Sequence, residues 1–217
     1  MTALGRRWLT AASGLAAVAA LLLVALAAFA RADSGPSVPA ADSADVGFAQ
    51  DMAIHHQQAV EMSFLVRDRT DDEEVRLLAY DIINTQANQR GMMLGWLRSW
   101  DAPVASGGAP MGWMAEMSEG GHGAHEAPDG ALMPGMATDA QLDELRAASG
   151  RDAEVLFLEL MTVHHRAGVE MAEAGAELAS TDEIRDLAAG MAAAQESEIG
   201  LMTDLLTARG AAPPPAD

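Results

Sequence analysis

Two stretches of this chain carry the same unusual pattern: "MAIHHQQAVEM" runs from Met52 to Met62, and "MTVHHRAGVEM" runs from Met161 to Met171. In each stretch, methionines frame two adjacent histidines at the same offsets. Sliding the chain against itself by 109 residues, which brings Met52 onto Met161, extends the match into the segment that follows. Further matched pairs are Phe48 with Phe157, Arg76 with Arg185, Ala79 with Ala188, Gln86 with Gln195, Gly91 with Gly200 and Met93 with Met202.

Each repeat predicts a helical hairpin. Apolar residues recur at spacings of three and four from Asp45 onward. Thr70-Asp71-Asp72-Glu73 matches a capping box and predicts the start of a second helix, which continues to about Trp100. In the second repeat, a capping box at Thr138 predicts a short helix that ends near Gly150.

Two long helices complete the second repeat. They are expected over residues 152–179 and from the cap Ser180-Thr181-Asp182-Glu183 to about Arg209. One hairpin cannot bury its own apolar face, so two hairpins predict an all-α four-helix bundle with one long crossover. The expected organisation is 1–30 signal peptide or membrane anchor, 31–44 flexible linker, 45–209 bundle (hairpin 45–101, Met/His-rich crossover 102–137, hairpin 138–209) and 210–217 disordered tail.

The N-terminus predicts export. Arg6 and Arg7 precede an uncharged stretch from Trp8 to Ala30, as in a signal peptide. This stretch is also long enough to span a bilayer, so a cleaved signal and an uncleaved anchor both remain open. In either case the body is expected outside the cytoplasm, in the periplasm, on the cell surface or secreted.

Composition narrows the class of function. The formal net charge is −19 and all 13 basic residues are arginine, which argues against nucleic acid as a partner. Contact with a membrane is expected only through the N-terminal segment. There is no cysteine, so soft-metal chemistry has to use thioether and imidazole.

The repeated motifs point imidazoles into the bundle. At 100° per residue the first helix presents one apolar stripe with His56 at its flank, made of Phe48, Met52, His55, Ala59, Met62 and Val66. The second repeat places Met161, His164, Gly168 and Met171 inward in the same way. Methionine is also a common core filler, and a single interior histidine is often structural. Four such histidines nevertheless need partners, which a bound metal would supply.

The ligand types favour copper. Methionine stands where a di-iron bundle has the carboxylate of its Glu-x-x-His motif. Thioether is neutral and soft, so it favours Cu(I), while imidazole accepts either oxidation state of copper and also zinc. Met52 lies one turn from His55 and His56, so these three can converge on one ion.

A second position is expected farther along the bundle. Met62 lies about 10 Å from His55 along the helix axis, so Met62 and Met171 either serve a second site with Met93 or Met202, or simply pack the core. The polar residues of the companion helices either orient the imidazoles or lie on the helix surface; these are Gln86, Gln89, Gln195 and Glu198.

The crossover carries further soft donors. We expect an exposed, disordered loop that either captures copper or covers one end of the bundle; its candidate donors are Met111, Met114, Met117, His122, His125, Met133 and Met136.

The sequences "GFAQDMAIHHQQAVEM", "MPGMAT" and "LFLELMTVHHRAGVEM" resemble the domain-of-unknown-function family 305 over roughly residues 45–206. The resemblance implies a ferritin-like four-helix fold in an exported bacterial protein and, for some members, copper binding. It also implies a ligand role for Met52, His55, His56, Met62, Met161, His164, His165 and Met171. The segment "GRDAEVLFL" departs from the Phe-Asp pair expected there, which concerns the start of the helix.

The sequence therefore predicts an exported copper-binding protein that sequesters, buffers or delivers Cu(I), with a copper-handling protein as its expected partner. The alternative is a membrane-tethered acidic helical module that binds a protein without metal. We expect no enzymatic activity, because no nucleophile–base pair or phosphate-binding loop is evident.

Overall fold

The computed structural model describes residues 38–115, 127 and 130–215. In this part of the chain the helices are α2 (Ala44–Arg67), α3 (Glu73–Ser99), the short 3₁₀ helix η1 (Gly112–Met114), α5 (Asp139–Ala147), α6 (Arg151–Leu178) and α7 (Asp182–Ala208). The described residues contain no strand, so the all-α prediction is confirmed. None of these helices combines the length and apolar character needed to cross a bilayer. The expected signal or anchor segment, residues 8–30, lies outside the described residues.

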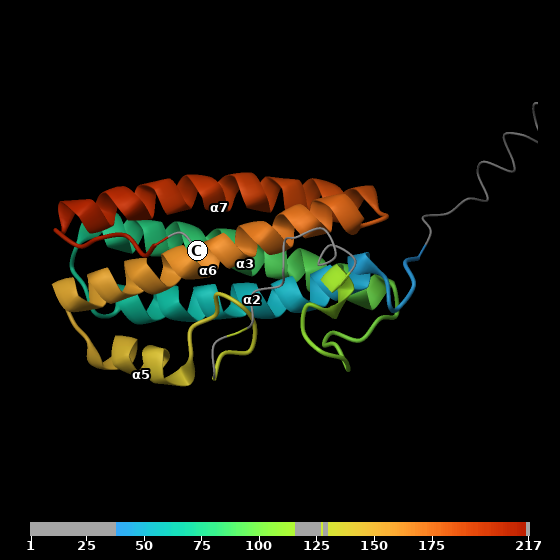
Figure 1. The fold of residues 1–217 in the computed structure, drawn as a ribbon, viewed down its shortest axis with the longest axis horizontal. Helices are drawn as coiled ribbons and strands as arrows, with labels where there is room; N and C mark the ends of the chain where they lie inside the picture. Colours follow the sequence, from blue (N-terminus) through green and yellow to red (C-terminus); the bar gives the residue numbers. More distant parts are fainter. Residues whose placement is uncertain (1–37, 116–126, 128–129, 216–217) are drawn as a thin grey trace, which may run out of the picture. The chain divides into compact units, whose positions relative to one another are not determined.

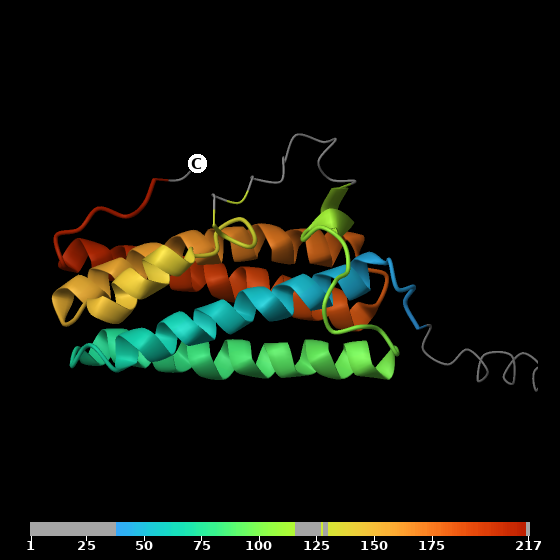
Figure 2. The same ribbon diagram turned by 90° about the horizontal axis from the view of Figure 1, so that it is seen from below.

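The four long helices form a bundle of two hairpins (Figure 1). Helix α3 returns along α2, and α7 returns along α6; the two hairpins meet mainly where α2 packs against α6. The short helix α5 lies outside the bundle against α2 and α6, and η1 lies against α2 (Figure 2). The predicted bundle of two duplicated hairpins is confirmed.

Most helix ends agree closely with the expected ones, but α3 begins later than its capping box suggested. Its N-cap is Asp72, whose Oδ1 accepts a hydrogen bond from the N–H of Val75 at 3.0 Å. Thr70, the expected cap, donates its hydroxyl hydrogen to Oε1 of Glu154 at 2.5 Å and accepts the N–H of Asp72 at 2.9 Å. The hydroxyl of Thr70 is used in holding α6, so the cap shifts to Asp72.

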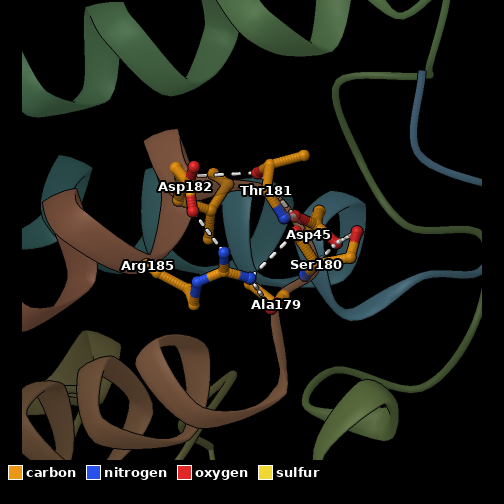
Figure 3. A network of polar contacts seen from close by, with 7 residues as sticks. Asp45, Ala179, Ser180, Thr181, Asp182 and Arg185 are labelled. Carbon is orange, nitrogen blue, oxygen red and sulfur yellow. Dashed lines mark hydrogen bonds and ion pairs between the residues drawn. The ribbon is translucent and has the colours of Figure 1, made fainter. Parts of the chain in front are cut away.

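Two matched carboxylates connect the hairpins. The oxygens of Asp45, at the start of α2, accept hydrogen bonds of 2.6 to 3.0 Å from the N–H and hydroxyl groups of Ser180 and Thr181, at the start of α7 (Figure 3). Burial alone would raise the pKa of Asp45, but these hydrogen bonds outweigh burial and hold the pKa below its ordinary value. Glu154 occupies the matching position in the second repeat, and it binds Thr70 just before α3. Each hairpin is thus tied to the turn of the other.

The apolar core has two parts. The proximal core cluster lies where α2 begins and includes Val46, Phe48, Ala49, Met52, Met93, Met171, Ile184 and Met191. The distal core cluster lies where α2 ends and includes Met62, Val66, Val75, Ile82, Phe157, Met161, Met202 and Leu206. The segment of α2 between them carries His55 and His56.

The proximal core cluster depends on a close approach between α2 and α6. A Cβ atom added at Gly175 would lie 2.5 Å from the ring of Phe48, which is completely buried. Gly190, by contrast, lies in α7 with no neighbouring atom within 4 Å of such a Cβ atom.

We expect Gly175→Ala and Gly190→Ala to change stability in opposite directions. Gly175→Ala forces Phe48 or the backbone to shift, and should lower the free energy of unfolding by about 1–3 kcal/mol. Gly190→Ala adds a good helix former in open space, and should raise that free energy by roughly 0.5–1 kcal/mol. Urea unfolding followed by circular dichroism measures both. Equal effects from the two substitutions would contradict the close approach.

The C-terminal segment also has a defined path. The disorder expected over residues 210–217 stays a prediction; residues 210–215 run beside α6 in the structure, and residues 216–217 lie outside the described residues. The guanidinium of Arg166 donates hydrogen bonds to the carbonyl oxygens of Pro214 at 2.9 Å and Pro215 at 2.5 Å.

Candidate metal centre

Four histidines form one buried layer between the two core clusters. The histidine layer consists of His55 and His56 on α2 and His164 and His165 on α6, and all four side chains are completely buried. The rings of His55 and His164 stack with their centroids 3.7 Å apart and their planes at 28°. The rings of His164 and His165 lie 6.2 Å apart. Packing of α2 against α6 therefore brings the two sequence motifs together.

The companion helices supply one partner to each outer imidazole. Nε2 of His56 lies 2.8 Å from Oε1 of Gln89 on α3, and Nε2 of His165 lies 2.8 Å from Oε2 of Glu198 on α7. The two contacts are related by the repeat. Because amide and carboxylate oxygens only accept hydrogen bonds, each Nε2 donates the hydrogen, and a ring in its neutral form then keeps its lone pair on Nδ1. Gln89 explains why His56, expected at the flank of the stripe, is fully buried.

The histidine layer concentrates the unpartnered polar atoms of the bundle. Among the described residues, twelve buried side-chain nitrogen or oxygen atoms have no hydrogen-bond partner, and ten of them belong to three residue pairs that the repeat duplicates. These pairs are His55 with His164, His56 with His165, and Gln86 with Gln195. Leaving such atoms unpaired costs about 1–3 kcal/mol each. Of the two positions considered for Gln86 and Gln195, the structure shows the buried one: both side chains lie inside the bundle and not on the helix surface.

Burial favours the neutral form of His55, His56 and His164. Desolvation lowers the pKa of His56 to about 3, although the hydrogen bond with Gln89 acts in the opposite direction. Desolvation also lowers the pKa of His55 and of His164 well below the ordinary value, and the neighbouring histidines add to that effect. Neutral rings present lone pairs to a metal near neutral pH without first losing a proton.

Six completely buried thioethers flank the histidine layer, three on each side. The proximal methionines are Met52, Met93 and Met171, and the distal methionines are Met62, Met161 and Met202. Each set draws one methionine from α2, one from α6 and one from a companion helix. The 109-residue repeat matches each proximal methionine with a distal one: Met52 with Met161, Met171 with Met62, and Met93 with Met202. We expected Met62 and Met171 to serve one second site together with Met93 or Met202, but Met171 lies with Met93 in the proximal core cluster and Met62 lies with Met202 in the distal one.

The stacking of His55 on His164 limits how these rings can share an ion. The lone pair of a ring nitrogen lies in the plane of its ring. An ion in the plane of one stacked ring lies well outside the plane of the other. The two rings therefore serve different ions, or one ring turns when metal binds. The described residues contain no group of three or more His, Asp or Glu side chains placed to hold an ion by themselves. The donors gathered in this region are imidazole nitrogen and thioether sulfur.

The crossover is more ordered than expected in its described parts. Met133 and Met136 are buried, so they are not donors in an exposed loop. Gly135, between them, has a φ of +74°, and a side chain there would overlap α6. Gln58 of α2 and the backbone of Ala137 exchange hydrogen bonds of 2.7 and 2.8 Å. These contacts hold the segment against α2 and α6.

Met111 and Met114 are half-buried against the proximal core cluster. Met117, His122 and His125 lie outside the described residues, so the prediction of auxiliary copper ligands there stands as a prediction.

Sequence reasoning missed Gln50 and Asp51, which hold the first part of the crossover. Oδ2 of Asp51 accepts hydrogen bonds from the N–H of Met111 at 2.8 Å and from Nε1 of Trp113 at 3.0 Å. Nε2 of Gln50 donates to the carbonyl of Pro103 at 2.7 Å. Burial raises the pKa of Asp51 despite these hydrogen bonds. An amide and a carboxylate inside an otherwise apolar helix are the pattern that could have revealed this role, because buried polar groups need partners.

Comparison with known proteins agrees with this architecture. The profile of the family described as a domain of unknown function, DUF305, matches residues 45–206. A DUF305 protein from Streptomyces coelicolor, described as secreted, has a solved structure that is 55% identical to this chain with a TM-score of 0.72. That match covers 82% of this chain and 100% of the other. No curated protein matches the chain in sequence.

Two further solved structures share the fold. A DUF305 fragment from Deinococcus radiodurans is 29% identical, with a TM-score of 0.61, over 76% of this chain and 95% of that fragment. CopM in its Cu(I)-bound form is 22% identical, with a TM-score of 0.57, over 75% of this chain and 95% of CopM. CopM has also been solved with Cu(II) and with silver. At this identity the likeness to CopM concerns the fold alone.

Proposed function

The chain belongs to the DUF305 family, and on this fold we propose that the histidine layer and its flanking methionines bind Cu(I) reversibly as cargo. The protein sequesters, buffers or delivers the ion outside the cytoplasm and turns over no substrate. The single observation that carries the proposal is the histidine layer, with six buried imidazole nitrogens that have no partner among the residues that the structure describes.

A bound cation would pair with the buried imidazole nitrogens and remove the free-energy cost of leaving them unpaired. Four buried histidines without a ligand leave the native state with unpaired acceptors and donors. Proteins keep such groups where a ligand pairs with them, and the neutral state of the rings suits a metal. The matched duplication of His55, His56 and Gln86 in the second repeat argues against an accident of packing.

The donor chemistry selects copper. The proximal and distal methionines offer neutral, soft sulfur on both sides of the imidazoles, which favours Cu(I) over hard cations. The chain has no cysteine, so thiolate does not compete for the ion. Imidazole also accepts Cu(II), so a weaker Cu(II)-bound state is part of the proposal. The solved forms of CopM add that the same fold holds Cu(I), Cu(II) and silver in another protein.

An extracytoplasmic location fits both the N-terminal sequence and the relative from Streptomyces coelicolor that is described as secreted. An acidic protein with a net charge of −19 also attracts cations weakly over its whole surface, which raises their local concentration.

We expect the His55→Ala/His164→Ala variant to lose tight copper binding. Its affinity for Cu(I) should fall by about 100-fold or more, because both stacked imidazoles are removed. The measurement is an anaerobic titration of the full chain with Cu(I) against a competing chromogenic chelator, with circular dichroism to confirm the helical fold.

Two matched variants separate binding from packing. His122→Ala/His125→Ala removes the same number of histidines from the crossover and should keep tight binding. Met93→Leu conserves volume, removes a buried sulfur and should weaken binding, whereas Met92→Leu, at an exposed neighbour, should not. Unchanged affinity and stoichiometry in the His55/His164 variant would rule out this site. A melting temperature that copper leaves unchanged would favour the acidic interaction module instead.

A further inference from the structure

The two halves of the histidine layer are alike in geometry but differ in charge. His56 and His165 occupy matching positions, and each places its Nε2 atom 2.8 Å from an oxygen of the companion helix. In the first repeat that oxygen belongs to the amide of Gln89. In the second it belongs to the carboxylate of Glu198. The two repeats therefore differ in the chemistry of this partner, which is neutral in the first repeat and a carboxylate in the second.

A carboxylate partner changes what the imidazole can do. A hydrogen bond from a ring N–H to a charged oxygen is roughly twice as strong as one to a neutral oxygen. It fixes the ring more firmly and makes the opposite nitrogen a stronger donor to a metal. The opposite nitrogen of His165, Nδ1, is buried and has no hydrogen-bond partner in the described part of the chain. The negative charge of Glu198, whose side chain is 23% exposed, also offsets the charge of an incoming cation.

Stacking of the central rings bears on how the two halves fill. While His55 and His164 keep this stacking, an ion held in the plane of His55 does not lie in the plane of His164, and each half can fill on its own. Each half also has thioethers close at hand along its own helix, since Met52 precedes His55 by three residues and Met161 precedes His164 by three.

We propose that the two halves bind copper unequally, that the His165 half fills first, and that Glu198 is the positioning residue that sets this order. The inference rests on the proposed function. It adds that duplication has produced one strong and one weak position, so that the protein retains one ion while the other exchanges with a partner.

The test compares matched histidines before and after an exchange of their partners. In the wild-type background, His165→Ala should lower the affinity for the first Cu(I) ion about 10-fold more than His56→Ala does, within the range known for partners of ligating histidines. The double variant Gln89→Glu/Glu198→Gln keeps the same net charge and moves the carboxylate to the first repeat. In that background the order should reverse, and His56→Ala should become the more damaging change.

A merely structural role of Glu198 cannot produce this reversal, because the exchange removes the same contact from one half and builds it in the other. If a histidine variant fails to fold, the single variants give the same answer. Glu198→Gln should weaken the first binding step about 10-fold, and Gln89→Glu should strengthen the second.

The outcomes distinguish the two proposals. Copper binding by the wild type with equal losses from His165→Ala and His56→Ala overturns the inequality and leaves the copper function standing. The same holds if the exchange fails to reverse the order. Absence of any Cu(I) binding by the wild type overturns the proposed function, and this inference with it.

Discussion

Acidification from about pH 7 to about pH 5 is expected to destabilise the copper-free protein by several kcal/mol, enough to unfold a domain of ordinary stability. The cause is the histidine layer. His55, His56 and His164 have pKa values in the folded protein that lie below the ordinary value of 6.5, with His56 at about 3. In the unfolded chain all three titrate near 6.5.

The direction follows from proton binding. Below about pH 6.5 the unfolded chain takes up protons on these histidines, while the folded chain does not. Stability is therefore fully present above that pH and is lost as the pH falls toward the folded pKa values. Each histidine contributes about 1.4 kcal/mol per pH unit, and the three together contribute roughly 4 kcal/mol per pH unit.

The measurement is urea unfolding of the copper-free protein at a series of pH values between about 7.5 and 5, where ordinary carboxylates stay ionised. The variant His55→Asn/His164→Asn removes two of the three groups, so its stability should depend on pH about one third as steeply. Saturating Cu(I) should also flatten the dependence, because the ion keeps the ring nitrogens unprotonated. A wild-type slope well under 1 kcal/mol per pH unit would show that the histidines are not buried as a neutral layer.

This dependence bears directly on copper exchange. In the folded protein the rings of His55, His56 and His164 resist protonation in mild acid, so protons act on them mainly by unfolding the copper-free protein. If the protein binds copper as proposed, its affinity should therefore fall with pH in step with the stability of the copper-free fold.

The second large effect is expected from the two carboxylates that connect the hairpins. Glu154→Ala should lower the free energy of unfolding by about 3–5 kcal/mol, because among the described residues it leaves the buried guanidinium of Arg209 with Asp72 as its one remaining carboxylate. Asp45→Ala should lower it by about 3 kcal/mol, since four hydrogen bonds to a charged group are lost at Ser180 and Thr181.

Asp182→Ala is the matched control. Asp182 forms an exposed ion pair with Arg185 in the same region (Figure 3), and its loss should cost less than about 1 kcal/mol. Thermal and urea unfolding of the three variants gives the comparison. If Asp45→Ala and Glu154→Ala were as mild as this control, the connections between the hairpins would not stabilise the bundle.

Much of the fold could be predicted because it depends on local pattern and on the repeat. Apolar spacing located the long helices, and the capping box at Thr138 was confirmed in full. The start of α3 was misplaced because the hydroxyl of Thr70 binds Glu154, a residue far away in the sequence. Met133 and Met136 were wrongly expected in an exposed loop. The contacts that hold this segment, such as that of Ala137 with Gln58 of α2, come from residues far away in the sequence. Local sequence does not report such partners.

The sequence by itself determined that four histidines and six of the methionines recur at matched positions, with His55 and His164 facing inward and His56 at the flank, because helical periodicity sets which side chains share a face. Only the tertiary structure decided that His55 stacks on His164, that the methionines divide into proximal and distal sets, and that Gln89 and Glu198 hold matching rings. Those features depend on the register in which α2 packs against α6 and each companion helix. Side-chain packing across helices sets that register, and it is not encoded in any single segment.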